Sequence, residues 1–247
     1  MKKILVTGHR GYIGAHLIPL LKSEGYYVIG TDIGLFDGCE WESLTAPDED
    51  WNIDIRNIHA VQLEGIDTVM HLAAISNDPM GDLNADITYS INLHGSIHLA
   101  QESKKAGVRK FLFSSSCSIY GKSEKPDMEE TDPTTPLTAY AISKIEVEKA
   151  LLQMADGHFS PAYLRNATAF GHSANLRIDL VVNNLLACAI ARGDIRIMSD
   201  GSPWRPLIHC KDIARAFVAF EKAPIETIHN QIVNIGGNAE NYQVRDV

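Results

Sequence analysis

Short apolar runs alternate with longer helix-like segments through the first 165 residues of the chain. The runs typical of strands are 3–7, 27–31, 68–72, 110–114 and 162–165. The segments typical of helices are 12–24, 88–106 and 138–155. Strands interleaved with helices indicate βαβ units, so the chain is predicted to be an α/β protein with a doubly wound parallel sheet.

The alternation loosens after residue 165. We expect helices over 180–192 and 212–222, strands over 195–198 and 231–235, and a turn at 201–203. Such a sequence of elements favours a smaller lobe that lies on the main sheet and returns a late strand to it. The predicted division is therefore a first domain over 1–165 and a second lobe over 166–247.

The composition limits the classes of partner. Apolar residues make up 45% of the 247 residues and charged residues 21%, as is typical of a globular protein with a sizeable core. The net charge of −9 disfavours nucleic acid, and no apolar run approaches the length of a membrane span. The cysteines form no C-x-x-C pair, which favours reduced thiols. We predict a cytoplasmic protein that binds neither nucleic acid nor membrane.

Three glycines connect the first predicted strand to the first predicted helix. Gly8, Gly11 and Gly14 have the spacing G-x-x-G-x-x-G. In a dinucleotide-binding turn they allow a tight bend, a close approach of the backbone to a pyrophosphate, and close packing of helix on strand. A tight connection without a ligand has the same pattern, so the turn needs support from elsewhere in the chain.

Acidic residues follow the next strands at places where a dinucleotide would meet them. Asp32 comes directly after the second predicted strand, where a carboxylate can bind the adenosine ribose and repel the 2′-phosphate of NADP. Arg10, inside the glycine turn, favours the opposite choice because a guanidinium can hold that phosphate. Asp54 can accept from the adenine amine or cap its own loop. On balance the pattern favours NAD.

Tyr140 and Lys144 lie four residues apart on a predicted helix, so both side chains project from one face. An ammonium near a phenol favours the phenolate, which makes the tyrosine a usable general acid/base. The spacing alone is also typical of a solvated helix face. A second element supports the catalytic interpretation: the run from Ser114 to Gly121 ends a predicted strand, where open α/β sheets bind ligands. A serine-rich turn that caps the strand is the alternative.

The whole pattern resembles the extended short-chain dehydrogenases/reductases, and within them the NAD-dependent nucleotide-sugar epimerases and dehydratases. The resemblance covers nearly the whole chain. It rests on Thr7-Gly8-x-x-Gly11-x-x-Gly14, Asp32, Asp54-Ile55, His71-Leu72-Ala73-Ala74, Asn92-x-x-Gly95-Ser96, the run from Ser114 to Gly121, Tyr140-x-x-x-Lys144 and Arg205, all in family order. It implies an NAD-binding domain of Rossmann type over 1–165 and a substrate-binding lobe over 166–247 that is C-terminally truncated relative to the family.

The resemblance also implies roles for residues at matching positions. Ser116 matches the catalytic serine, Tyr140 the acid/base, and Lys144 the residue that tunes the tyrosine and holds the nicotinamide ribose. The positions that match cofactor-binding residues are Gly8, Gly11, Tyr12, Ile13, Gly14, Asp32, Asp54, Ile55, Leu72, Ala73, Ala74, Asn92, Ser114, Tyr140, Lys144 and Asn166. The positions that match substrate-binding residues are Ser116, Thr168, Asn184 and Arg205. A guanidinium at position 205 suits a diphosphate.

Two positions depart from the family pattern. Thr168 stands where an asparagine that contacts substrate is usual, and Pro206 stands where an aspartate often follows the arginine. Both changes affect which sugar the site can bind. The residues after Ser116 concern the reaction: dehydratase relatives place Asp-Glu there and a decarboxylase relative places Glu, whereas this chain has Cys117 and Ser118. Without a local carboxylate, the pattern favours oxidation followed by re-reduction over elimination.

The resulting prediction is an epimerase that oxidises a nucleotide-diphosphate sugar to a bound 4-keto sugar and reduces it again. The alternatives are a nucleotide-sugar ketoreductase or dehydratase, and a non-catalytic dinucleotide-binding protein. Relatives dimerise through two helices from each subunit, so the resemblance implies a homodimer through the helices that carry Asn92 and Tyr140. His94 and His98 share a helical face, but no third ligand is evident, so no metal is predicted.

Overall fold

The computed structural model describes residues 1–76, 83–121, 127–197 and 199–247. Its main sheet has seven strands in the order β3-β2-β1-β4-β5-β6-β9. They are β1 (Lys3–Thr7), β2 (Tyr27–Thr31), β3 (Glu49–Trp51), β4 (Thr68–His71), β5 (Lys110–Ser116), β6 (Ser160–Asn166) and β9 (Ile232–Ile235). Every neighbouring pair is parallel. The prediction of an α/β protein with a doubly wound parallel sheet is confirmed.

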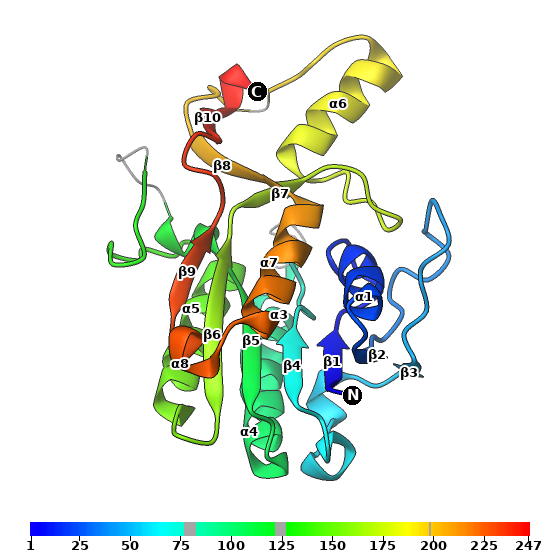
Figure 1. The fold of residues 1–247 in the computed structure, drawn as a ribbon. Coiled ribbons are helices and arrows are strands. Elements are labelled where there is room, and N and C mark those ends of the chain that lie inside the picture. Colours follow the sequence, from blue (N-terminus) through cyan, green and yellow to red (C-terminus); the bar gives the residue numbers. More distant parts are fainter. Residues whose placement is uncertain (77–82, 122–126, 198) are drawn as a thin grey trace.

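Helices cover both faces of this sheet (Figure 1). One face carries α1 (Gly14–Ser23) and α7 (Cys210–Lys222), which contact each other. The other carries α4 (Ser96–Ala106) and α5 (Ala139–Met154). A short α3 (Ala85–Thr88) and a π-helical stretch (Tyr89–Gly95) lead without a break into α4, so the helix predicted over 88–106 begins earlier and is wound more loosely at its start.

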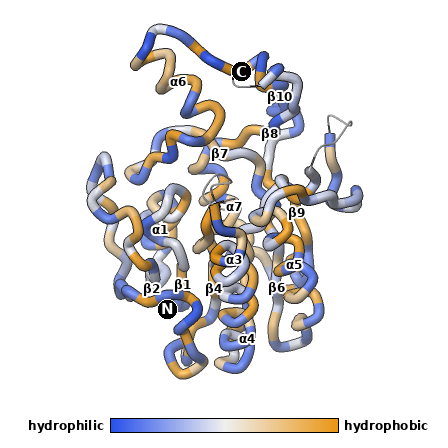
Figure 2. Tube along the Cα trace, turned by 180° about the vertical axis from the view of Figure 1, so that it is seen from behind, coloured by the Kyte–Doolittle hydropathy of each residue, from blue (hydrophilic) through white to orange (hydrophobic). Residues whose placement is uncertain are grey.

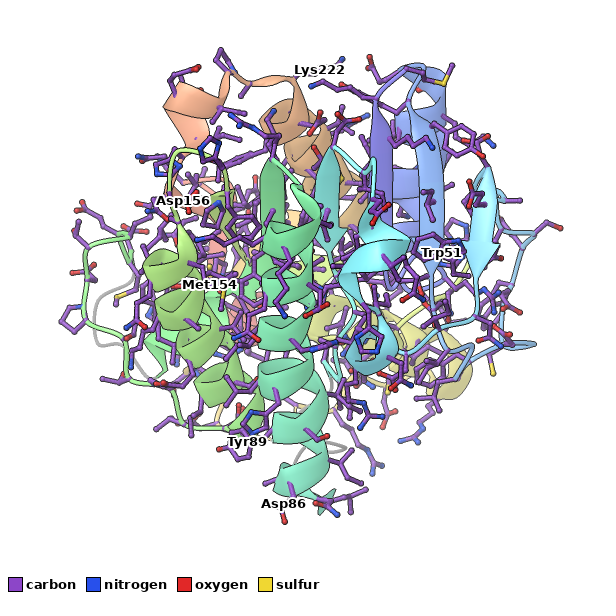
Figure 3. The ribbon with its side chains drawn as sticks, turned by 90° about the horizontal axis from the view of Figure 1, so that it is seen from below. Trp51, Asp86, Tyr89, Met154, Asp156 and Lys222 are labelled. Atoms are coloured by element: carbon purple, nitrogen blue, oxygen red, sulfur yellow. The ribbon has the colours of Figure 1, made fainter. Side chains whose placement is uncertain are left out.

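Figure 3 looks at the same layers from below. Asp86 and Tyr89 lie toward one end of the long helix that becomes α4, and Met154 lies on the neighbouring α5. Trp51 of β3 marks one side of the sheet, and Asp156, which follows α5, lies toward the opposite side.

The alternation of side chains along β5 divides the core into two halves. Phe111 and Phe113 pack toward α4 and α5, in a cluster that includes Leu99. Leu112, between them, packs toward α1 and α7, in a cluster that includes Phe217. This period of two is the geometry of a strand buried on both faces. This alternation therefore fixes which face of the sheet each residue of β5 meets.

The chain runs outward from β1 in both directions along the sheet, first to β2 and β3 and then to β4, β5 and β6. The direction of winding reverses between β1 and β4. In open α/β sheets, ligands bind outside the carboxyl ends of the strands at such a reversal. The glycine turn after β1 and the serine run after β5 both lie at this edge.

A smaller lobe stands above that edge (Figure 1). It holds a three-stranded sheet in the order β10-β8-β7, formed by β7 (Thr168–Phe170), β8 (Trp204–His209) and β10 (Asn241–Gln243). The helix α6 (Val181–Arg192) belongs to the same lobe. The strand expected over 195–198 is wrong for 195–197, which form neither strand nor helix, and position 198 lies outside the described residues.

The lobe is connected to the main sheet through two later elements. α7 lies on the α1 face, and β9 pairs in parallel with β6, while α8 (Ile225–Ile228) connects them. Short 3-10 helices complete the chain at Ile55–Asn57, Ala60–Leu63, Cys117–Tyr120 and Val244–Asp246. Within the described ranges, no helix is both long and apolar enough to cross a membrane.

Candidate active site

The glycine turn is shaped by close backbone contacts. Gly8 has a positive φ of 71°, and its N–H donates to Thr31 O at 2.8 Å. A Cβ on Gly8 would lie 2.8 Å from Ala73 N, and a Cβ on Gly14 would run into the carbonyl of Gly8. Any side chain at either position would therefore push the turn out of place. The turn delivers the start of α1 to the carboxyl edge of the sheet, and the N-terminus of a helix favours negative charge.

A chain of buried hydrogen bonds fixes the neighbouring strand end. Thr7 Oγ1 accepts from Leu72 N (3.2 Å) and Ala73 N (3.1 Å), and it lies 2.7 Å from His71 Nδ1. His71 Nε2 lies 2.7 Å from Ser96 Oγ, which itself donates to the carbonyl of Asn92. Because burial lowers the pKa of His71 to about 3, the ring is neutral. We assign the proton to Nε2, with Thr7 donating to Nδ1.

Asn92 holds the segment that follows β4. Its side chain accepts from Ile75 N and donates to Ile75 O, both at 2.8 Å. Leu72, Ala73 and Ala74 thus lie between two fixed points, Thr7 at one end and Asn92 at the other.

Asp32 and Asp54 differ in how their carboxylates are held. Asp32 accepts from two backbone groups, Arg10 N at 3.2 Å and Gly34 N at 3.0 Å. Asp54 caps the 3-10 helix that begins at Ile55, and it accepts from Arg56 N and from the guanidinium of Arg56. The hydrogen bonds from Arg56 lower the pKa of Asp54. The capping role expected as an alternative is therefore present, and a contact with adenine stays a prediction.

Tyr140 and Lys144 lie one turn apart near the start of α5, which Thr138 caps by accepting from Ala141 N. The ammonium of Lys144 lies 5.5 Å from the centre of the Tyr140 ring and 4.8 Å from that of Phe113, and it donates to Ser114 O at 2.7 Å. Only 3% of Lys144 is exposed, and this burial lowers the pKa of its ammonium to about 7. The lysine is thus directed inward, between the tyrosine and the end of β5.

The serine run contributes three differently used hydroxyls. Ser114 Oγ accepts from Asn166 Nδ2 at 3.0 Å. Ser115 Oγ donates to the buried carboxylate of Glu148 at 2.5 Å. Ser116 ends β5 and accepts from Ser118 N at 3.1 Å, which caps the 3-10 helix that follows. The serine run therefore caps the 3-10 helix and also contacts Lys144, so both interpretations offered for it apply.

A buried ion pair lies beneath these residues. Glu148, one turn after Lys144, pairs with Arg165 of β6 at 2.7 Å. Arg165 also donates to the hydroxyl of Tyr120 (2.9 Å), which in turn donates to Asn234 Oδ1 (2.7 Å). This network joins α5, β5, β6 and β9. Sequence reasoning missed Glu148, although its spacing of four from Lys144 places it on the same helix face.

The predicted substrate residues lie on separate elements of the lobe. Thr168 is half-buried on β7, Asn184 is exposed on α6, and Arg205 is exposed on β8. Asn184 lines a surface cavity of about 270 Å³ together with Asp179 and Arg196. The guanidinium of Arg205 donates to the carbonyl of Trp204 at 2.9 Å. Within the described ranges, no hydrogen bond or ion pair joins these three residues to one another.

Sequence reasoning also missed a contact between the lobe and the glycine turn. Tyr12 donates from its hydroxyl to Gly171 O (2.6 Å), and its own carbonyl accepts from Ser173 Oγ (2.8 Å). Asn175 donates to the carbonyl of Arg10 at 3.0 Å. The residues in each contact are separated by about 160 positions or more in the chain, so no local sequence pattern predicts these contacts.

A family model described as the NAD dependent epimerase/dehydratase family matches residues 4–236. The chain belongs to this family. The predicted resemblance to extended short-chain epimerases and dehydratases is confirmed, as are the predictions of an enzyme and of NAD as its cofactor.

Relatives in this epimerase/dehydratase family match along nearly the whole chain. A UDP-glucose 4-epimerase of Neisseria meningitidis serogroup C is 32% identical over 96% of this chain and 78% of that protein. The structure of UDP-glucuronic acid 4-epimerase from Bacillus cereus with UDP-glucuronic acid and NAD is 27% identical, with a TM-score of 0.83 over 99% of this chain and 80% of the other. An NAD-dependent NDP-hexosamine 5,6-dehydratase, TunA, shares the fold with a TM-score of 0.88 at 24% identity, over 100% of this chain and 78% of that one.

The residues of this family member fit the cofactor on structural grounds. Asn166 Oδ1 is buried and has no hydrogen-bond partner among the described residues, while its Nδ2 is bound to Ser114. A buried acceptor without a donor is costly, and the amide N–H of a nicotinamide is a suitable donor at the ends of β5 and β6. At the other end, Gly8 and Gly14 keep the turn tight, because a side chain at either position would collide with the neighbouring backbone, as a dinucleotide-binding turn requires.

Proposed function

We propose that this enzyme is a 4-epimerase of a nucleotide-diphosphate sugar. The observation that carries the proposal is the position of the Lys144 ammonium between the Tyr140 ring and the end of β5, together with the residue that follows Ser116. Cys117 donates from its thiol to the carbonyl of Arg165 at 3.2 Å, and burial raises its pKa to about 12. It therefore stays protonated and cannot act as the extra base that elimination needs. The relatives named as 4-epimerases support the same reaction.

NAD, when bound, supplies the acceptor and later the donor of hydride at the sugar C4. Tyr140 takes the proton of the C4 hydroxyl as the sugar is oxidised, and it returns a proton when the 4-keto sugar is reduced on its other face. Ser116 holds the reacting oxygen by a hydrogen bond. Lys144 stabilises the phenolate of Tyr140 through its nearby positive charge, and its donation to Ser114 keeps it oriented.

The proposed cofactor site runs along the carboxyl edge of the sheet. The glycine turn and the start of α1 hold the pyrophosphate, Asp32 accepts from the adenosine ribose, and Asp54 lies toward the adenine. The segment from Leu72 to Ala74 lines the middle, and Asn166 receives the nicotinamide amide. Two observations support this site. The buried Oδ1 of Asn166 has no hydrogen-bond partner among the described residues, and the backbone around Gly8 is closely packed.

The proposed substrate site lies in the lobe, over residues 166–247. We assign the diphosphate to Arg205, whose guanidinium can bind two phosphate oxygens at once. Asn184 contributes from α6, beside a cavity of about 270 Å³, and Thr168 lies on the strand that directly follows β6. UDP-sugars are the first class to test, because the named relatives act on them.

We further propose a cytoplasmic homodimer. The described helices of the expected interface expose apolar side chains, among them Ile87 at the start of the long helix and Leu152 near the end of α5. All four cysteines are free thiols, which suits a reducing compartment. Light scattering of the purified protein tests the dimer, and a monomeric mass at working concentration contradicts it.

The experiment that tests the function is a screen of nucleotide sugars with catalytic amounts of NAD. We expect formation of the C4 epimer, followed by NMR, with no accumulation of reduced nicotinamide. Reduced nicotinamide that accumulates in proportion to product would indicate a one-way dehydrogenase instead, and net consumption of added NADH would indicate a reductase. A product lighter by one water would indicate a dehydratase. Tyr140→Phe serves as the inactive control.

A further inference from the structure

Arg10 begins at the place where the two nicotinamide cofactors differ. Its backbone N–H donates to Asp32 Oδ2 at 3.2 Å, so its side chain leaves the glycine turn beside the carboxylate assigned to the adenosine ribose. NADP carries a phosphate on that ribose. A free guanidinium there would hold the phosphate through a charge-assisted fork. A basic residue in this turn therefore raises the question of why the enzyme prefers NAD.

The guanidinium of Arg10 is bound by two other carboxylates. Nη1 donates to Asp37 Oδ2 at 2.8 Å, and Nη2 donates to both oxygens of Asp50 at 3.1 and 3.2 Å. Asp37 lies in the loop after β2, and Asp50 lies on β3. Two carboxylates thus bind the guanidinium, and a third, that of Asp32, binds the backbone N–H of the same residue. The group carries a formal charge of −2 and repels an added phosphate dianion.

Local packing holds both carboxylates in place. Asp50 is paired in register with Gly30, and the His9 ring occupies the space that a side chain at position 30 would need, since a Cβ there would lie 2.6 Å from the ring. His9 Nε2 lies 3.2 Å from Asp50 Oδ1. Asp50 is thus contacted by Arg10 and by a buried imidazole.

Asp37 is positioned by a turn. Its N–H donates to Gly34 O at 3.1 Å, and a Cβ on Gly34 would collide with the Asp37 carboxylate. Gly34 has a φ of 66°, and its own N–H donates to Asp32 Oδ1. The same short loop therefore orients Asp32 toward the ribose and Asp37 toward Arg10.

We propose that Asp37 and Asp50 determine cofactor specificity: they bind the guanidinium of Arg10 and withhold it from the 2′-phosphate of NADP. This inference rests on the cofactor site proposed above, with Asp32 at the adenosine ribose. The two carboxylates act through Arg10, and no role in the hydride or proton steps is assigned to them.

The test is a fluorescence titration of NADH and NADPH without sugar, on the wild type, on Asp37→Asn/Asp50→Asn, and on the same double variant with Arg10→Met added. In the double variant we expect NADPH to bind about tenfold or more tighter, because a released guanidinium gains charge-assisted hydrogen bonds to the phosphate. NADH affinity should stay within about fivefold of the wild-type value, because the ion pairs that are lost are exposed and contribute little. Adding Arg10→Met should cancel the gain.

Three results would overturn the inference. The first is an unchanged NADPH affinity in the double variant. The second is a gain that persists after Arg10→Met, which would show that removal of negative charge suffices. The third is loss of both nucleotides, which would show that the cluster only shapes the loop. Asp32→Ala separates these results from a failure of the site itself: if NADH binding is insensitive to Asp32, the proposed cofactor site is wrong, whatever the epimerase assay shows.

Discussion

The floor is the part of the molecule made of α5, β5 and β6, beneath the predicted catalytic residues. It is built in the opposite way to the lobe that carries the predicted substrate residues. All residues of β6 and the first six of β5 are buried, whereas α6 has no buried residue. Figure 2 shows apolar stretches on α6 although the helix stands apart from the main sheet. The floor is also joined internally by the buried Glu148–Arg165 pair, while the pair that follows α6, Arg196 with Asp194, is exposed.

This difference matches the two tasks proposed for the enzyme, which are proton transfer at the floor and sugar recognition in the lobe. Proton transfer needs groups held within a fraction of an ångström, and the buried floor supplies that constraint around Lys144 and Ser116. Recognition of one sugar among many depends on surfaces that can change without disturbing the core. We therefore expect substitutions in the floor to alter turnover and stability, and substitutions in the lobe to alter substrate affinity.

The largest effect is expected from Tyr140→Phe. Loss of the general acid/base should lower kcat by about a thousandfold. Binding of NADH, measured by fluorescence titration, should change little, because the phenol is one of many contacts along the cofactor. Activity within tenfold of the wild type would remove Tyr140 from the chemistry.

Glu148→Gln tests the rigidity of the floor. It leaves the buried guanidinium of Arg165 without its carboxylate, which should lower the free energy of unfolding by about 3–5 kcal/mol, measured in guanidinium chloride. The matched control is Glu146→Gln on the same helix, whose pair with Lys149 is exposed and should contribute less than about 1 kcal/mol. Equal effects from the two variants would show that the buried pair contributes no more to the free energy of unfolding than the exposed pair.

Arg205→Met tests the lobe. Loss of a charge-assisted contact with a diphosphate should weaken binding by about 2 kcal/mol, seen as a KM for the nucleotide sugar raised roughly thirtyfold with kcat little changed. The free energy of unfolding should not change, because Arg205 is exposed. A fall in kcat at constant KM would place this arginine in the chemical step and contradict the division between floor and lobe.

Lys144 gives the floor a distinctive pH dependence. Its pKa is about 7 in the folded protein and near 10.5 in the unfolded chain, so between these values the unfolded chain binds the extra proton. Stability contributed by position 144 must then rise with pH over this window, by up to about 1.4 kcal/mol per unit, and stay constant below about pH 7, where both states carry the proton. The readout is the difference in unfolding free energy between wild type and Lys144→Met, from pH 7 to 10. A flat or falling difference contradicts burial of the ammonium.

The smallest effect is expected from Ile190→Ser on α6. Ile190 is 78% exposed, so its replacement should change the free energy of unfolding by less than about 0.5 kcal/mol. The matched substitution in the floor is Val147→Ser on α5, at a fully buried position, which should be destabilising by several times that amount. Comparable losses would show that α6 is packed more tightly in solution than its exposure indicates.

The elements predictable from the sequence are those with strong periodicity. The buried strands β1, β4 and β5 and the helix α5 lie close to their expected bounds, because apolar runs and a capping threonine mark them locally. β3 (Glu-Asp-Trp) and β10 (Asn-Tyr-Gln) were missed because each is short and polar and is a strand only by pairing at a sheet edge. β8 was missed because Pro206 within it reads as a turn.

The candidate site divides in the same way. Motif spacing indicated Tyr140 and Lys144 because both lie on one face of α5, and the family resemblance indicated Ser116, which ends β5. The roles of Glu148 and of the carboxylates around Arg10 depend on partners 17 to 40 positions away in the chain, so they become visible only in three dimensions. Asp54 shows the converse, since the sequence allowed both a cap and an adenine contact and the structure displays the cap.

The most direct measurement of the central claim is the fate of a deuterium label at C4 of the nucleotide sugar. The enzyme is incubated with a UDP-sugar deuterated at C4, in ordinary water with catalytic NAD, and the epimer is analysed by NMR and mass spectrometry. Oxidation and re-reduction at C4 within one site predict that the product epimer retains the deuterium at C4. An epimer whose C4 carries hydrogen from the solvent would contradict the proposed reaction.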